Sequence, residues 1–340
     1  MVVVLLVLLA VAGWLGLRRY EEAWLARPIA ALRQPVVFTV PAGASLTAVA
    51  NALQQAGLLD QQWVWIRHAK RAGGATRIRA GEYQLRPGAT PAGLLRQFVA
   101  GDVLLYSLTI PEGWTFSQAL AAIRGHPAVA AEFAGLAPDE LMTRLGLAGR
   151  HPEGMFFPDT YRFPRGTTDR ALLQQAHARL ERELAAAWKQ RSTGLPFDTP
   201  YEALILASLV ERETGAPDER PLIAGVFTNR LRKGMRLQTD PSVIYGLGER
   251  FDGDLRRRDL EADTPYNSYT RSGLPPTPIA LPGRAALMAA VQPAATDALY
   301  FVATGKGDGR HYFANSLAAH NANVTRHLAA LRSSDGDRVR

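Results

Sequence analysis

Apolar residues fill positions 203–210 almost completely, and Ser208 is the one polar residue among them. A segment this apolar predicts a buried helix, because a surface helix would carry polar residues along one face. Glu211 and Glu213 follow directly, and Gly215 is expected to end the helix as a left-handed cap. Apolar surroundings and the negative end of the helix dipole disfavour a charged carboxylate, so a glutamate here is expected to have a raised pKa and to suit general acid catalysis. The alternative is a structural helix whose last turn simply reaches solvent.

A second pattern joins a short apolar strand through a Pro/Gly turn to a Ser or Thr and then to a helix. It predicts helices at 46–58, 92–99 and 116–123, and each Ser or Thr stands where a helix N-cap belongs. A further helix at 59–71 gives the order strand, helix, helix, strand between residues 36 and 86. This order resembles a LysM module, a small peptidoglycan-binding fold, and it fits a generic small α+β domain equally well.

A larger unit of α/β or α+β type is predicted from residue 105 onward. Its expected elements are helices at 171–191, 203–214, 222–233 and 285–291, a hairpin formed by 299–303 and 310–314, and a final helix at 315–331. Gly- and Pro-rich segments occupy 234–283, and the last residues, 333–340, are expected to fray. The predicted fold class of the chain is therefore α+β.

The N-terminal segment is uncharged through residue 17, is rich in Val and Leu, and is followed by Arg18 and Arg19. As a helix it would span about 26 Å, which is at the lower limit for crossing a membrane. We expect a transmembrane anchor at 1–19, with a cleavable signal peptide as the alternative. The two arginines would by the positive-inside rule keep the following chain in the cytoplasm, a conflict that a basic stretch upstream of the present start would remove.

The composition of the chain limits which partners and which kinds of catalytic site are expected. The length of 340 residues suits two domains, and the hydrophobic content of 47% excludes a disordered chain. The net charge of +8 suits an anionic partner such as nucleic acid, a membrane surface or an acidic wall polymer. The chain has no Cys, and His151, His311 and His320 lack metal-ligand spacing. Motifs of zinc proteases, esterases and NTPases do not occur, so we predict neither a metal nor a cofactor.

Three irregular segments, 153–161, 235–246 and 266–283, combine aromatic residues with amides and carboxylates. A sugar presents C–H faces and hydroxyls together, so its binding site needs these side-chain types side by side. The candidates for sugar binding or transition-state support are Gln238, Asp240, Tyr245, Asn267 and Tyr269. Structural alternatives remain: Asp240 could cap a helix, Asn267 could be a turn residue, and the tyrosines could belong to the core.

Taken with 203–214, 300–302 and 319–321, these segments make the chain resemble the endolytic murein transglycosylases of the MltG (YceG-like) family over about residues 36–332. The resemblance implies a single-pass inner-membrane protein whose catalytic domain lies in the periplasm. It also implies peptidoglycan glycan strands as substrate, peptidoglycan synthases as candidate partners, and no nucleic acid. The expected order is an anchor at 1–19, a juxtamembrane linker at 20–35, a LysM-like domain at 36–104, a catalytic domain at 105–332 and a flexible tail at 333–340.

Only one of the two glutamates can face a cleft, since residues two apart on a helix point about 200° away from each other. In lytic transglycosylases the acid is followed by Ser or Thr, as Glu213 is followed by Thr214. The resemblance implies that Glu213 protonates the oxygen between MurNAc and GlcNAc and then accepts the proton of the MurNAc C6 hydroxyl, which closes a 1,6-anhydro ring. Glu211 is then expected to support the site from behind, paired with an arginine.

Two other functions fit parts of the sequence. A non-catalytic wall-binding scaffold would use the small domain to hold glycan, but it has no need for a carboxylate at the end of an apolar helix. Nucleic-acid binding would rest on the positive charge alone, and the membrane anchor argues against it.

Overall fold

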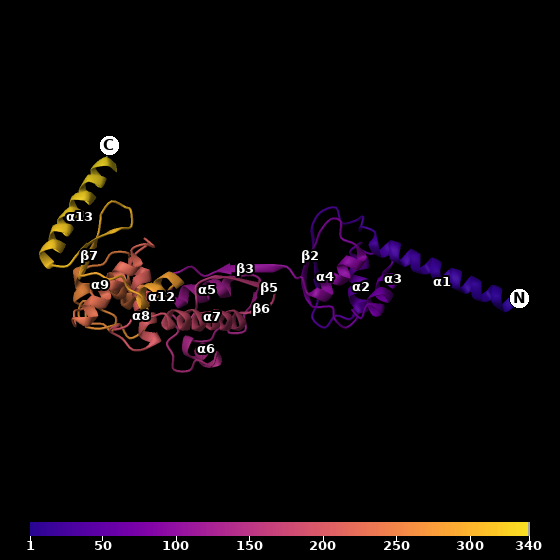
Figure 1. Cartoon of the computed structure of the whole chain (residues 1–340), viewed down its shortest axis with the longest axis horizontal. Helices are drawn as coiled ribbons and strands as arrows, with labels where there is room; N and C mark the ends of the chain where they lie inside the picture. Colours follow the sequence, from indigo (N-terminus) through magenta and orange to yellow (C-terminus); the bar gives the residue numbers. More distant parts are fainter. Residues whose placement is uncertain (339–340) are drawn as a thin grey trace. The chain divides into compact units, whose positions relative to one another are not determined.

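The computed structural model describes residues 1–338 as a mixed α/β arrangement of helices and two-stranded sheets (Figure 1). The chain divides into two compact units. The small unit contains residues 1–107 and 162–167, and the larger unit contains 108–161 and the chain from 168 onward. The predicted boundary after residue 104 lies close to this division. The return of 162–167 to the small unit was not predicted, because it depends on the pairing of strand β5 (Thr160–Pro164) with strand β3 (Leu105–Thr109).

Helix α1 (Val2–Ala26) begins the small unit and is long and apolar enough to cross a membrane. Its last turns are buried in the unit. Glu21 forms ion pairs with Arg71 at 2.7 Å and Arg67 at 3.2 Å, and the Trp24 indole donates to Asp60 at 2.8 Å. The segment that we expected to be a linker, 20–35, therefore begins as helix and contributes to the core, because its apolar side chains pack against the rest of the unit.

The rest of the small unit has the predicted order of strand, helix, helix and strand, followed by a third helix. The elements are β1 (Val36–Val40), α2 (Leu46–Gln55), α3 (Gln62–Arg71), β2 (Gly81–Leu85) and α4 (Pro91–Ala100). Strands β1 and β2 are antiparallel, with Phe38 opposite Tyr83. The predicted caps are present, since the side chains of Ser45 and Thr90 accept bonds from backbone N–H groups in the first turns of α2 and α4.

The larger unit consists mainly of helices. Its elements are α5 (Phe116–Gly125), β4 (Val129–Ala130), α6 (Pro138–Arg144), α7 (Asp169–Lys189), α8 (Pro200–Glu213), α9 (Arg220–Arg232), α10 (Asp240–Leu247), the 3₁₀ turn η1 (Gly248–Arg250), α11 (Arg257–Glu261), α12 (Arg284–Val291), β7 (Tyr300–Ala303), β8 (His311–Ala314) and α13 (Leu317–Arg338). The short strand β6 (Thr167–Thr168) spans the division of the chain after residue 167. The predicted hairpin is confirmed, with Phe301 of β7 opposite Phe313 of β8. Helix α13 continues past residue 331 to Arg338, where we expected a flexible tail, and residues 339–340 lie outside the described chain.

Helix α8 is the centre of the larger unit, where it packs against α7, α9, α10 and α12. Residues 203–211 are all buried, which confirms the buried helix predicted from the apolar run. Thr199 and Glu202 form a capping box at its start. The predicted glycine cap at its end is wrong. Thr214 follows Glu213 in an extended conformation with φ −138°, and its hydroxyl accepts a bond from Ala216 N–H at 2.9 Å, so the chain leaves the helix without a left-handed residue.

Candidate active site

Glu213, the last residue of α8, lines a cavity of about 600 Å³ within the larger unit. Three of the predicted binding residues, Gln238, Asp240 and Tyr269, line the same cavity. The other lining residues are Arg230, Leu237, Tyr300, Phe301, Val302, Ala303, His311, Leu317, His320, Asn321, Val324 and His327. The structure therefore brings the glutamate helix, the loop before α10, the β7–β8 hairpin and one face of α13 to a single space.

The carboxyl group of Glu213 lies in an environment that favours its neutral form. Burial raises the pKa of Glu213 from its ordinary value to about 7, and the charge of Asp240 also raises it. The Thr239 hydroxyl, which donates to Glu213 Oε2 at 2.5 Å, and the charge of Arg230 act in the opposite direction. A carboxylic acid with a pKa near 7 can give up a proton and take it back at neutral pH, which is what a general acid–base catalyst requires.

Asp240 is the first residue of α10 and is bound by Tyr269, whose hydroxyl donates to Asp240 Oδ1 at 2.5 Å. The helix N-cap is Thr239, so the alternative that Asp240 only caps the helix does not describe its position. Burial, together with the nearby Asp240 and Glu213 carboxylates, raises the pKa of Tyr269, and its hydroxyl remains a donor. The hydrogen bond between Tyr269 and Asp240 thus holds the Asp240 carboxylate in place beside Glu213.

Arg230 of α9 is buried in the cavity wall and holds the cavity loops by hydrogen bonds to backbone carbonyls. Its Nε donates to Leu299 O at 2.6 Å, and its Nη1 donates to Leu237 O at 2.8 Å. The guanidinium also lies over the ring of Tyr300, 5.2 Å from the ring centroid. Arg230 could not be predicted from the sequence, because nothing local separates an arginine that faces the core of an arginine-rich helix from one that faces solvent.

Gln238 has a φ of 51°, and it is the one non-glycine residue with positive φ in the part of the chain that the structure describes. Such a conformation costs free energy in a residue with a Cβ, so the surrounding contacts must hold it. Gln238 N–H donates to Ser268 O at 3.1 Å, and its side-chain oxygen accepts from Arg230 at 3.3 Å. These contacts fix the amide of Gln238 at the cavity wall.

Tyr300 and His320 form a stacked pair at the cavity, with ring centroids 5.2 Å apart and ring planes 24° apart. Burial and the charge of Arg230 lower the pKa of His320, which favours the neutral form of its ring. The sequence placed Tyr300 only within the motif 300–302, and it assigned His320 no metal-binding role. The stacked pair and the guanidinium of Arg230 thus hold two rings at the cavity wall.

Asn267 is fully buried and does not line the cavity. Its Nδ2 donates to three backbone carbonyls, those of Asp259, Leu260 and Ala262, and its Oδ1 accepts from the backbone N–H of Tyr269 at 2.8 Å. Direct contact with a ligand in this cavity is therefore excluded for Asn267. It is a turn residue that fixes the position of Tyr269.

Glu211 points away from the cavity, as two residues of separation on a helix require. Its side chain is 4% exposed, accepts from Arg220 at 2.8 Å and also accepts from the backbone N–H of Gly283 at 2.9 Å. The two glutamates of α8 thus have separate surroundings.

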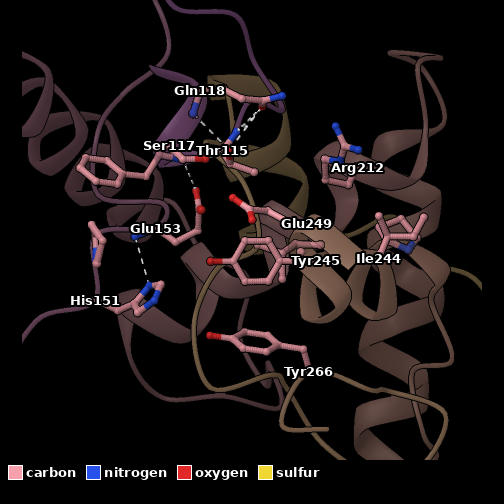
Figure 2. Close-up of a pocket in the computed structure, with 15 residues that line it drawn as sticks. Thr115, Ser117, Gln118, His151, Glu153, Arg212, Ile244, Tyr245, Glu249 and Tyr266 are labelled. Atoms are coloured by element: carbon pink, nitrogen blue, oxygen red, sulfur yellow. Dashed lines mark hydrogen bonds between the residues drawn. The ribbon is translucent and has the colours of Figure 1, made fainter. Parts of the chain in front are cut away.

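Tyr245, another predicted binding residue, does not line the cavity either. It lies in a second cavity with Glu153 (Figure 2).

These side chains place a carboxyl group of raised pKa beside aromatic, amide and carboxylate side chains in one cavity. The chain belongs to the YceG-like family, whose model matches residues 38–326. It is 30% identical to proteins named endolytic murein transglycosylase from Streptococcus pneumoniae strains D39 and R6, over 96% of this chain, and it spans 64% of the length of those relatives. A protein of the same name from Bacillus subtilis is 30% identical over 87% of this chain and 85% of its own. A crystal structure of a YceG-like protein from Listeria monocytogenes shares the fold, with a TM-score of 0.52 and 28% identity over 85% of this chain and 99% of that one.

Proposed function

We propose that this protein is an endolytic lytic transglycosylase, which cleaves the MurNAc–GlcNAc bond within peptidoglycan glycan strands and leaves 1,6-anhydro-MurNAc ends. The observation that carries the proposal is Glu213, whose carboxyl group has a pKa of about 7 in a cavity with aromatic, amide and carboxylate side chains. The names of the relatives from Streptococcus and Bacillus support the same substrate.

In this reaction Glu213 protonates the glycosidic oxygen while the bond from that oxygen to MurNAc C1 breaks. The positive charge that develops at C1 lies in a cavity that also holds the Asp240 carboxylate, which would stabilise it. Glu213, now charged, accepts the proton of the MurNAc C6 hydroxyl as that oxygen bonds to C1. The acid is regenerated and no water is consumed, in contrast to hydrolysis by two carboxylates.

Product analysis tests this proposal. The full chain in detergent micelles should convert purified glycan strands to fragments that end in 1,6-anhydro-MurNAc, which are lighter by one water than hydrolysis products. Digestion in oxygen-18 water, followed by mass spectrometry, measures the mass of the fragments and their uptake of labelled oxygen in one experiment. Reducing MurNAc ends that carry the heavy isotope would make the protein a hydrolase, and intact strands would favour a non-catalytic wall-binding scaffold.

The rate should depend on the protonation of Glu213. Because the acid form is needed, kcat/KM should fall as the pH rises through about 7. The negative charge of Asp240 raises the pKa of Glu213, so Asp240→Asn should lower that pKa and move the alkaline fall of the profile to lower pH. Asp198→Asn, at an exposed position outside the cavity, is the matched control and should leave the profile in place. An unmoved profile in Asp240→Asn would show that the titrating acid is another group.

We also infer the location of the protein and its partners. Helix α1 would serve as a single-pass anchor in the inner membrane, with both units in the periplasm where peptidoglycan lies. The small unit, with its strand, helix, helix, strand order, would act as a LysM-like domain that binds glycan. Peptidoglycan synthases are then the natural candidate partners, because they supply nascent strands.

A further inference from the structure

A second cavity, of about 670 Å³, lies in the larger unit and is not used by the chemistry proposed for Glu213 (Figure 2). The start of α5, the segment before Gly154, and α10 with the loops around it form its walls. The lining residues are Thr115, Phe116, Ser117, Gln118, His151, Pro152, Glu153, Arg212, Pro241, Ile244, Tyr245, Gly248, Glu249, Tyr266 and Ile279.

The two cavities are neighbours, because consecutive residues of the chain line one and then the other. At the end of α8, Arg212 lines the second cavity and Glu213 lines the first. At the start of α10, Asp240 lines the first and Pro241 lines the second. The last turn of α8 and the first turn of α10 therefore lie between the two cavities.

Glu153 is the most unusual residue of the second cavity, since its side chain is ionisable and yet only 3% exposed. Its Oε1 accepts from the backbone N–H of Phe116 at 2.9 Å, and the Tyr245 hydroxyl is a further hydrogen-bond partner. Burial raises the pKa of Glu153 to about 7. A carboxyl group that is this costly to bury and that reaches a cavity is a candidate for ligand binding.

The remaining walls suit a neutral ligand that is rich in hydroxyl groups. The rings of Tyr245 and Tyr266 lie 4.9 Å apart at an angle of 69°, and Figure 2 shows Tyr245 between Tyr266 and Glu153. Ser117 and Gln118 add exposed polar groups at the start of α5. The exposed charges at the cavity, Arg212 and Glu249, have opposite signs. Aromatic rings beside hydroxyl, amide and carboxyl groups are what a pyranose ring requires.

We propose that the second cavity is a saccharide subsite, in which Glu153 and Tyr245 bind the hydroxyl groups of a sugar that lies along the glycan strand from the bond cleaved at Glu213. This inference rests on the proposed function. Cleavage within a strand leaves sugars on both sides of the broken bond, and a subsite away from that bond would hold the strand while Glu213 acts. Binding there stabilises the enzyme–strand complex without entering the chemical step.

Hydrogen exchange of the full chain in detergent, with Glu213→Gln to prevent turnover, separates this inference from the function on which it rests. Isolated glycan strands should protect the segments of the second cavity, 115–118, 151–153 and 244–249, together with the segments of the first, 236–240 and 317–327. Protection of the first cavity alone would overturn the subsite and leave the proposed function standing. Protection of neither would count against both.

Affinity measurements with a matched pair of variants complete the test. Tyr245→Phe removes one hydroxyl and keeps the ring, so it should weaken strand binding about tenfold, the effect of one good hydrogen bond. Tyr312→Phe makes the same change on β8, outside both cavities, and should bind like the parent. Equal dissociation constants for the two variants, both folded by thermal melting, would overturn the role of Tyr245.

Discussion

Glu213→Gln should lose turnover by about 10²–10⁴-fold, the range that general acid catalysis contributes. Glutamine has the same shape, and its side-chain oxygen can still accept from the Thr239 hydroxyl, but it cannot supply the proton that the leaving oxygen needs. The measurement is the release of fragments from purified glycan strands by the full chain, beside its thermal melting curve.

The same variant should remain folded, and the direction of the stability change follows from linkage. The pKa of Glu213 is raised from 4.5 to about 7 in the folded protein, so the acid form is favoured by folding and the charged form is disfavoured. The stability that the acid form contributes is therefore present below pH 4.5 and is lost as the pH rises through about 7. Glutamine does not titrate, so at pH 8 the variant should be at least as stable as the parent. A folded, active Glu213→Gln beside a folded, inactive Glu211→Gln would reverse the assignment.

Glu211→Gln should reduce the free energy of unfolding by about 3–5 kcal/mol, because it removes one partner of a buried ion pair. The side chains of Glu211 and Arg220 are 4% and 12% exposed, and Gly283 N–H also depends on the Glu211 carboxylate. Chemical denaturation should show a lower midpoint with an unchanged slope.

A double variant provides the control for this prediction. Glu211→Leu combined with Arg220→Leu removes both charges, so the uncompensated arginine of the single variant disappears and part of the lost stability should return. An unchanged midpoint in Glu211→Gln would show that the pair contributes nothing. If the midpoint of Glu211→Gln falls as expected, the two glutamates of α8 are separable, because the Glu213 variant fails in turnover and the Glu211 variant in stability.

Local patterns were sufficient for several of the elements. The apolar run predicted the burial of α8, and the Ser or Thr before each early helix predicted caps that the structure contains at Ser45, Thr90 and Thr115. These features depend on neighbours a few residues away, which a sequence displays directly. The same reasoning located the cavity loops that carry Gln238 and Asp240.

Residues whose role depends on distant contacts could not be predicted. Arg230 acts through carbonyls near residues 237 and 299, and Asn267 is occupied by the carbonyls of 259–262. A ligand-binding asparagine and a turn asparagine have the same sequence signature.

The separation of Tyr245 from Asp240, in contrast, was predictable from the sequence. Five residues along a helix turn the side chain by about 140°, which points Tyr245 away from the first cavity.

Helix α1 enters the small unit without a break, and this continuity couples the rotation of its apolar N-terminal part about the helix axis to the rotation of the unit. Glu21, Trp24 and Leu25 lie in the core, while Trp14 and Arg18 lie on the same uninterrupted helix. Removal of one residue between Arg18 and Glu21 would turn the unit by about 100° around the helix axis and draw it about 1.5 Å toward the apolar segment. The number of residues in this short stretch, rather than their identity, therefore sets which side of the small unit is aligned with a given face of the apolar segment.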